Sequence, residues 1–73
     1  MALSLDDFAA VAALADTLHF GRAADRLYVS QPALSKRLKK MEEEIGGPLL
    51  VRGYRDVRLT EAGTALVRRA EKI

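Results

Sequence analysis

The stretch YVSQPALSKRLKKMEEEIG, residues 28–46, carries the signals of one complete helix over residues 30–45. Ser30 is a favourable N-cap because its hydroxyl accepts hydrogen bonds from amides of the first turn. Pro32 falls within that turn, where a missing N–H group costs little. Residues 46–48, Gly-Gly-Pro, end the helix, since glycine supplies a left-handed cap and proline prevents continuation. The stretch therefore predicts a helix with a defined start and a defined end.

This helix divides into an apolar side and a polar side. Its apolar residues recur at helical spacing and predict the side that faces a core. They are Leu34, Leu38, Met41 and Ile45. Val29 before the cap and Leu34 after it have the spacing of a hydrophobic staple. The opposite side is formed by Gln31, Pro32, Ser35, Lys36 and Lys39.

The charges of the helix run against its dipole. Four basic residues at positions 36, 37, 39 and 40 precede three glutamates at positions 42–44, the reverse of the order that a helix dipole favours. A helix whose first half contacts phosphates would have reason to keep this order. A solvated face with Lys39–Glu43 and Lys40–Glu44 pairs, each contributing about 0.2–0.5 kcal/mol, also accounts for it. The stretch alone leaves both interpretations open.

Length and composition favour one small domain. With 73 residues, 49% of them hydrophobic, the chain can build one small core. A net charge of +2 does not by itself indicate nucleic acid, but residues 21–58 hold nine basic against five acidic side chains. There is no cysteine, which excludes disulfides and thiolate metal sites.

Membrane insertion, export and catalysis are not expected. No apolar run approaches the roughly 20 residues that span a membrane, and the start MALSLDDF lacks the pattern of a signal peptide, so a soluble cytoplasmic chain is expected. The single histidine, His19, has no fixed relation to the three serines and is expected beside the last carbonyls of a first helix. No glycine motif for phosphates occurs, and consecutive helical glutamates point apart. Neither an enzyme nor a cofactor or metal site is predicted.

Two helices are predicted before residue 30. The first opens at Ser4, presents a broad apolar side and ends at residues 19–21, where Gly21 is available for a conformation that other residues avoid. That side comprises Leu5, Phe8, Val11, Leu14, Ala15 and Leu18. The second helix covers residues 21–28, GRAADRLY, whose paired alanines would let the next helix approach closely. Only two residues then separate it from the helix at 30–45, as in a helix-turn-helix.

A β-hairpin and a last helix are predicted after residue 48. Residues 49–51 and 57–59 have strand character around a turn at Gly53 and Tyr54. This wing carries Arg52, Arg55 and Arg58 against the single acid Asp56. Thr60 is the expected cap of the last helix, whose apolar stripe comprises Ala62, Leu66, Ala70 and Ile73. Such a stripe is expected to continue in a longer protein, to pack on a partner, or both.

Together, residues 18–63 resemble the N-terminal winged helix-turn-helix domain of LysR-type bacterial transcriptional regulators. The resemblance rests on SQPALS at residues 30–35 followed, at the family's distance, by LTEAG at residues 59–63. It implies a mostly α fold with a three-helix core, a short β-hairpin wing and a C-terminal linker and dimerisation helix. Residues 1–59 would form the DNA-binding domain and residues 60–73 the start of a truncated linker helix, with a larger effector-binding domain absent from this chain.

The resemblance also implies how DNA would be bound. A two-fold dimer would place the helix at 30–45 of each protomer in the major groove of a dyad-symmetric promoter site, with Gln31, Pro32, Ser35 and Lys36 entering the groove. Ser30 and the wing residues Arg52 and Arg55 would contact the backbone or minor groove. Lys39, on the same outer side of the helix, is a further predicted DNA-binding residue. Ala62, Leu66, Ala70 and Ile73 would form a homodimer, with higher oligomers open to the full-length protein, and a small-molecule effector would act only through the absent domain. The alternative is a helical oligomerisation module without specific DNA binding.

Overall fold

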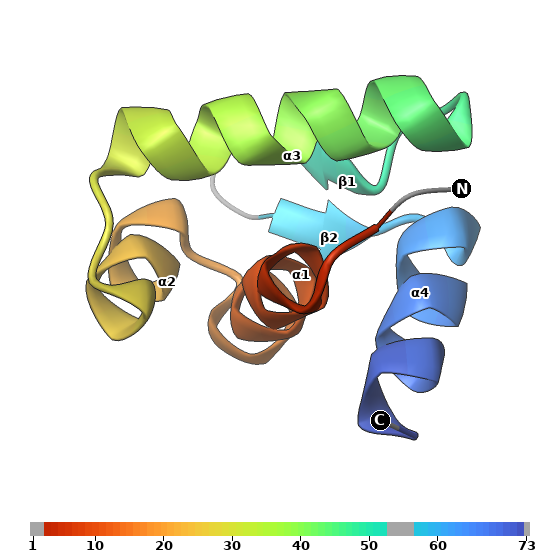
Figure 1. Cartoon of the computed structure of the whole chain (residues 1–73), viewed down its shortest axis with the longest axis horizontal. Helices are drawn as coiled ribbons and strands as arrows, with labels where there is room; N and C mark the ends of the chain where they lie inside the picture. Colours follow the sequence, from red (N-terminus) through yellow and green to blue (C-terminus); the bar gives the residue numbers. More distant parts are fainter. Residues whose placement is uncertain (1–2, 53–56, 73) are drawn as a thin grey trace.

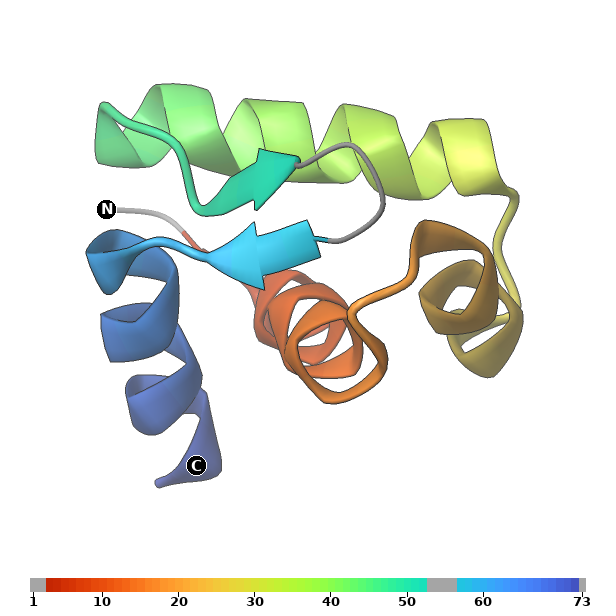
Figure 2. The ribbon, with the colours of Figure 1, turned by 180° about the vertical axis from the view of Figure 1, so that it is seen from behind.

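Four helices and a two-stranded sheet form the part of the chain that the computed structural model describes, residues 3–52 and 57–72. The order is α1 (Leu5–Thr17), α2 (Phe20–Leu27), α3 (Gln31–Ile45), β1 (Leu50–Arg52), β2 (Val57–Leu59) and α4 (Glu61–Glu71). In Figure 1, α3 runs along one edge of the molecule, with α1 and α2 below it and α4 beyond α1. Figure 2 shows the two strands extending in the direction of α3 on the opposite face of the molecule. This is the winged helix-turn-helix that the sequence predicted.

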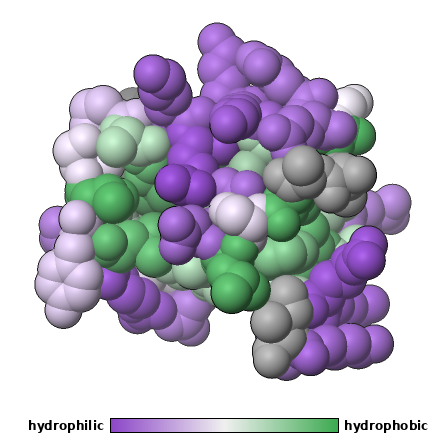
Figure 3. All heavy atoms as spheres, viewed as in Figure 1, coloured by the Kyte–Doolittle hydropathy of each residue, from purple (hydrophilic) through white to green (hydrophobic). Residues whose placement is uncertain are grey.

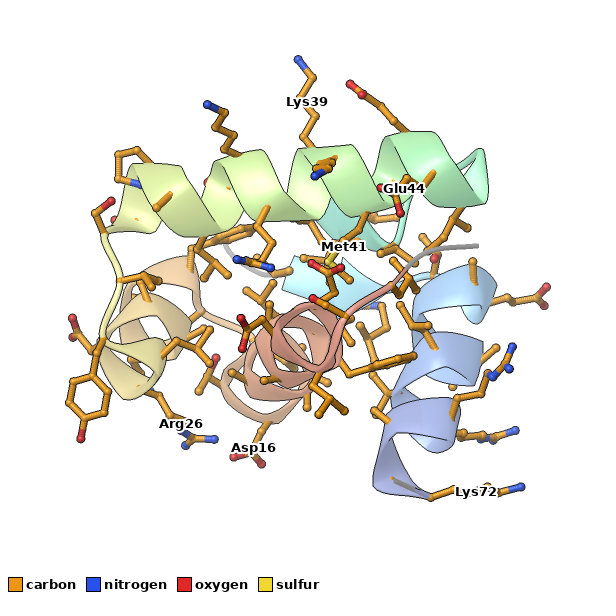
Figure 4. The ribbon with its side chains drawn as sticks, in the orientation of Figure 1. Asp16, Arg26, Lys39, Met41, Glu44 and Lys72 are labelled. Atoms are coloured by element: carbon orange, nitrogen blue, oxygen red, sulfur yellow. The ribbon has the colours of Figure 1, made fainter. Side chains whose placement is uncertain are left out.

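The predicted core side of α3 is confirmed. Leu34, Leu38 and Met41 are at most 4% exposed, and Ile45 packs against them half-buried. In Figure 4 the side chain of Met41 lies below α3, toward the interior of the molecule. The paired alanines of α2 are also buried, so that α1 and α3 both approach this helix closely. Apolar periodicity therefore located the centre of the core from sequence.

The predicted apolar side of α1 is wrong at its two ends. Leu5 is 68% exposed and Leu18 is 45% exposed, whereas Val11 and Leu14 are fully buried. Helical spacing placed all four on one side, but only the middle of α1 is covered by α2, α3 and α4. Periodicity describes the face of a helix and carries no information on how far along its axis the neighbouring helices reach.

The junction between α1 and α2 differs from the prediction. Leu18, rather than Gly21, adopts the left-handed conformation, at φ 51°, and Gly21 lies inside the first turn of α2. His19 does not cap α1. Its Nδ1 atom accepts a hydrogen bond from the backbone N–H of Arg22 at 3.1 Å, which makes it the N-cap of α2. Phe20 follows in the core at 8% exposure. A histidine after a helix can cap the next one, and the sequence does not separate the two roles.

The turn between α2 and α3 has three residues, because α2 ends at Leu27 rather than at residue 28. Tyr28 is the left-handed C-cap of α2, at φ 58°, with 95% of its surface exposed. Val29 is 43% exposed and donates its N–H to the carbonyl of Ala24. Ser30 accepts from the N–H of Ala33 at 3.2 Å and caps α3 as predicted. These local bonds set the angle at which α3 leaves α2.

The first wing strand is shifted by one residue from the prediction. Its bounds are Leu50–Arg52, and it pairs antiparallel with β2 so that Leu50 lies opposite Leu59. Leu49 is fully buried and lies just before the strand, opposite Thr60 in the register, because only its carbonyl joins the ladder and its N–H does not. Its N–H donates to Glu42 Oε2 at 2.7 Å, and its carbonyl accepts from the N–H of Thr60 at 3.0 Å. The turn predicted at Gly53 and Tyr54 lies outside the described residues.

The last helix begins as predicted, but its apolar stripe is divided. Thr60 Oγ1 accepts from the N–H of Gly63 at 3.0 Å and donates to the carbonyl of Pro48 at 2.7 Å. Leu66 is 4% exposed and belongs to the core of the protomer, whereas Ala62 is exposed and Ala70 is half-buried. Ile73 lies outside the described residues. Within residues 3–52 and 57–72, no helix has the length and apolar character needed to cross a membrane.

Candidate nucleic-acid interface

The outer side of α3 gathers most of the residues predicted to contact DNA. Ser30, Gln31, Pro32, Lys36 and Lys39 are all exposed, and Ser35 is half-buried among them. Figure 4 shows Lys39 projecting away from the body of the molecule. In Figure 3, hydrophilic side chains cover the edge formed by α3, whereas apolar atoms are visible on the face below it. The structure thus assembles this set on one accessible helix surface.

The lysines of α3 do not form the intrahelical pairs that a solvated face would use. In the described residues, the side-chain ion pairs within 4.0 Å are Arg26–Asp16 and Arg37–Asp7, so neither Lys39 nor Lys40 pairs with the glutamate four residues later. A lysine that is exposed and unpaired can neutralise a phosphate without first breaking an internal contact.

One basic residue of α3 has a structural partner that the sequence did not reveal. Arg37 Nη1 lies 2.8 Å from Asp7 Oδ1 in α1, thirty residues away in sequence. Asp7 also accepts from the backbone N–H of Ser4 at 3.0 Å, while Ser4 Oγ accepts from the N–H of Asp7 in a reciprocal capping box. Burial raises the pKa of the Asp7 carboxyl, but the hydrogen bonds from Ser4 and Arg37 outweigh it and hold the pKa below its usual value. Arg37 therefore ties α3 to the start of α1.

The lowered pKa of Asp7 predicts an acid-sensitive component of stability. A carboxyl whose pKa is lower in the folded state stabilises the fold above its unfolded pKa, and this contribution disappears as the pH falls through the folded value. Asp7→Asn should therefore lower the free energy of unfolding at pH 7, because it removes the ion pair with Arg37 and weakens the capping box. The expected loss is only about 1 kcal/mol, since Arg37 is 42% exposed and water screens the pair. The difference between the variant and the unchanged protein should begin to narrow below about pH 4, near the unfolded pKa, and disappear only below the lower folded pKa of Asp7.

Urea denaturation followed by circular dichroism across pH 3–7 measures this difference. Asp6→Asn is the matched control, because it removes the same charge from the neighbouring, exposed position. Equal pH profiles for the two variants would contradict the assignment.

The three glutamates at the end of α3 do not share one role. Glu42 is half-buried, and its carboxylate holds the backbone N–H of Leu49 where the chain enters the wing. Glu43 and Glu44 are exposed. Part of the unusual charge order therefore has a structural reason, since one acid organises the connection between α3 and β1. A sequence pattern of three consecutive acids cannot indicate which one turns inward.

The wing residues are only partly placed. The backbone of Arg52 lies in β1, opposite Val57, and Arg55 lies outside the described residues. Arg58, on β2, is exposed and pairs in register with Val51. Within the described ranges, no cluster of three histidine, cysteine, aspartate or glutamate side chains is arranged to hold a metal ion.

Comparisons with known proteins agree with this geometry. The family described as bacterial regulatory helix-turn-helix protein, lysR family, matches residues 5–64. The chain belongs to this family. Among its relatives, the HTH-type transcriptional regulator BudR of Klebsiella aerogenes is 52% identical over 61 residues, which cover 84% of this chain and 43% of BudR. The resemblance inferred from SQPALS and LTEAG is thus confirmed, and the function class is that of a transcription regulator's DNA-binding domain.

Solved structures of this family include complexes with DNA. The DNA-binding domain of BenM with its catB site 1 DNA has a TM-score of 0.89 and 36% identity, covering 96% of this chain and 79% of that one. The CbnR DNA-binding domain with DNA has a TM-score of 0.88 and 31% identity, covering 96% and 80%. The chain spans between 20% and 24% of the length of the first five curated relatives, all of which are transcriptional regulators.

Proposed function

We propose that this LysR-family domain binds double-stranded DNA in a sequence-specific way as a two-fold dimer, with one α3 helix per protomer in the major groove. The observation that carries the proposal is the outer surface of α3, where exposed polar and unpaired basic side chains follow one another from Ser30 to Lys39. The DNA complexes of BenM and CbnR, which share the fold, support it. An oligomerisation module without DNA binding would not need this surface.

Individual residues receive different proposed roles. Gln31, Ser35 and Lys36 face base edges, with Pro32 packed beside them in the groove. Ser30 and Lys39 contact phosphates, as do Arg52 and Arg55 from the wing. Lys36 carries a compact point charge rather than the planar fork of arginine, so its contribution to base recognition is through one donor at a time. These contacts need no cofactor, and no catalytic role is proposed. The proposed place of action is the bacterial cytoplasm, where promoter DNA is found.

The proposed dimer uses α4, but one of the four residues predicted for the interface is removed from it. Leu66 is buried within the protomer, so it stabilises the fold and is not available to a partner. Exposed Ala62 remains in the proposed interface, together with Ala70 and Ile73. Two copies docked on opposite halves of a site would place their α3 helices about 34 Å apart, one turn of the double helix. An effector-binding domain elsewhere in the longer protein is proposed to control this arrangement.

Selection of bound duplexes from random DNA tests the proposal directly. The expected result is an inverted repeat whose half-sites are separated by about one helical turn or a multiple of it. Enrichment of no sequence above the starting pool would overturn sequence-specific binding, and enrichment of single half-sites would overturn the dimer.

The assigned roles predict distinct effects of alanine substitutions. Ser35→Ala and Lys36→Ala should reduce the preference for the selected site over unrelated DNA by about 5- to 150-fold, since each base contact contributes about 1–3 kcal/mol of discrimination. Arg55→Ala should weaken all sequences alike because a phosphate contact carries no sequence information. Fluorescence anisotropy with labelled specific and unrelated duplexes measures both effects. The opposite pattern would exchange the roles of helix and wing.

A further inference from the structure

The two flanks of α3 face different neighbours. On one flank, Glu42 bonds to Leu49 and so borders the chain that leads into the strands. On the other flank, Arg37 bonds to Asp7 and borders α1. A groove of about 650 Å³ lies between this second flank and α1, and its wall on α3 includes Lys36, Arg37, Lys40 and Glu44.

Lys39 and Lys40 lie on different flanks, although they are adjacent in sequence. Successive helical residues are turned by about 100°, and neighbours on the surface are three or four residues apart. Lys40 follows Lys36 by four residues and Arg37 by three, so it continues the row beside α1, in agreement with its place in the wall of the groove. Lys39 follows Ser35 by four residues and continues the row toward the strands.

The flank beside α1 holds three cations, Lys36, Arg37 and Lys40, of which Arg37 is engaged. Arg37 is bound to Asp7, which neutralises part of its charge. Lys40 is exposed and forms no ion pair with any described side chain. Because Lys36 is already assigned to base edges, Lys40 is the further cation on this flank that can hold a phosphate without losing an internal contact.

The major groove brings phosphates to both flanks of an inserted helix. The groove is about 12 Å wide and an α-helix with its side chains is about 10–12 Å across. A helix that fills the groove consequently has the backbone of one strand along each flank. Only cations on opposite flanks can neutralise both backbones.

We propose that Lys40 is a further DNA contact, whose ammonium group holds a phosphate of the strand on the α1 side of α3, opposite the strand that Lys39 contacts. This inference rests on the proposed binding of α3 in the major groove. It assigns the two adjacent lysines to different strands and adds a residue to the predicted set. The helix is thereby held from both sides, which fixes its rotation in the groove.

Acidic residues limit how far along this flank of α3 the DNA backbone stays in contact. The groove beside α1 is also lined by Asp6, Asp7 and Glu44, of which Asp7 is neutralised by Arg37. Glu44 stands one helical turn beyond Lys40, a separation of about 5–6 Å that lies within the screening length of physiological salt. Its charge repels a backbone that continues past Lys40. The strand on this flank is therefore held at Lys40 and released beyond it.

Substitutions of Lys40 and Glu44 test the inference, with binding measured on the duplex obtained by the selection from random DNA. Lys40→Gln should weaken binding about fivefold per protomer at 0.15 M salt and reduce the steepness of the salt dependence by about one per protomer. Glu44→Gln should tighten binding. Lys72→Gln is the matched control for net charge, since Figure 4 shows Lys72 at the far end of α4, on the other side of the molecule from Lys39. It should change affinity less than twofold.

Neutral phosphate analogues identify the strand. A methylphosphonate placed in the strand beside α1 should weaken binding of the unchanged protein but cause little further loss in Lys40→Gln, because the same contact cannot be lost twice. The same variant should remain sensitive to an analogue in the other strand, whereas Lys39→Gln should show the reverse pattern. Equal effects of Lys40→Gln and Lys72→Gln, with normal binding by the unchanged protein, would overturn the inference alone. Absence of binding by the unchanged protein would instead overturn the proposed function.

Discussion

Gly63→Ala is expected to lower the free energy of unfolding by about 3 kcal/mol or more. A Cβ atom at this position would lie 2.2 Å from the carbonyl oxygen of Leu49, far inside van der Waals contact. That oxygen cannot move aside, because it accepts the N–H of Thr60 at 3.0 Å and the N–H of Leu49 is held by Glu42. The strain would therefore separate α4 from the segment that joins α3 to the wing.

Thermal and urea denaturation followed by circular dichroism measure this effect. For a domain of this size, 3 kcal/mol corresponds to a fall in Tm of about 12–24 °C. Gly47→Ala is the matched control, since its added Cβ meets nothing within 4 Å and its backbone does not require glycine. A Gly63→Ala variant as stable as Gly47→Ala would show that α4 does not approach Leu49 as described.

Raising the salt concentration from 0.1 to 0.3 M is expected to weaken binding to the selected site by about 250-fold. Lys39, Arg52 and Arg55 are proposed to neutralise about three phosphates per protomer, so the logarithm of the dimer's affinity should fall with the logarithm of salt at a slope near −5 before the further contact of Lys40 is counted. The exposed, unpaired lysines of α3 are the physical reason, because they release condensed counterions from the DNA without giving up protein contacts.

Anisotropy titrations at several salt concentrations give this slope directly. The comparison with unrelated duplex DNA is the control, since phosphate contacts should produce a similar slope there at much lower affinity. A slope near zero on both duplexes would contradict electrostatic docking through α3. A steep slope with no difference in affinity between them would retain phosphate binding and remove sequence recognition.

The local signals of the chain were sufficient for most of the architecture. Ser30 and Thr60 cap their helices as predicted because capping hydrogen bonds connect residues only three positions apart. The core side of α3 followed from the spacing of Leu34, Leu38 and Met41. The exposed set from Gln31 to Lys39 followed in turn, since residues opposite a buried stripe must face solvent.

The predictions from sequence were wrong where two local structural signals competed. Leu18 and Tyr28 adopt left-handed conformations at which glycine is preferred, so the ends of α1 and α2 carried no clear signal. His19 was assigned to the helix before it and caps the helix after it. Leu49 was predicted to begin β1, but its N–H bonds to Glu42 instead of to the opposite strand, and only its carbonyl bonds in register to Thr60. In each case a hydrogen bond chose between alternatives that spacing left equivalent.

The sequence by itself determined the presence of the helices, the N-caps of α1, α3 and α4, the side of α3 that is buried and the family to which the chain belongs. Only the tertiary structure decided that Arg37 is engaged by Asp7, that Leu66 lies in the core and that Gly63 permits α4 to contact Leu49. Helix caps and periodicity arise from neighbours within one or two turns, whereas these three contacts join elements that come together only when the helices pack. That packing leaves Lys39 and Lys40 unpaired on the two flanks of α3.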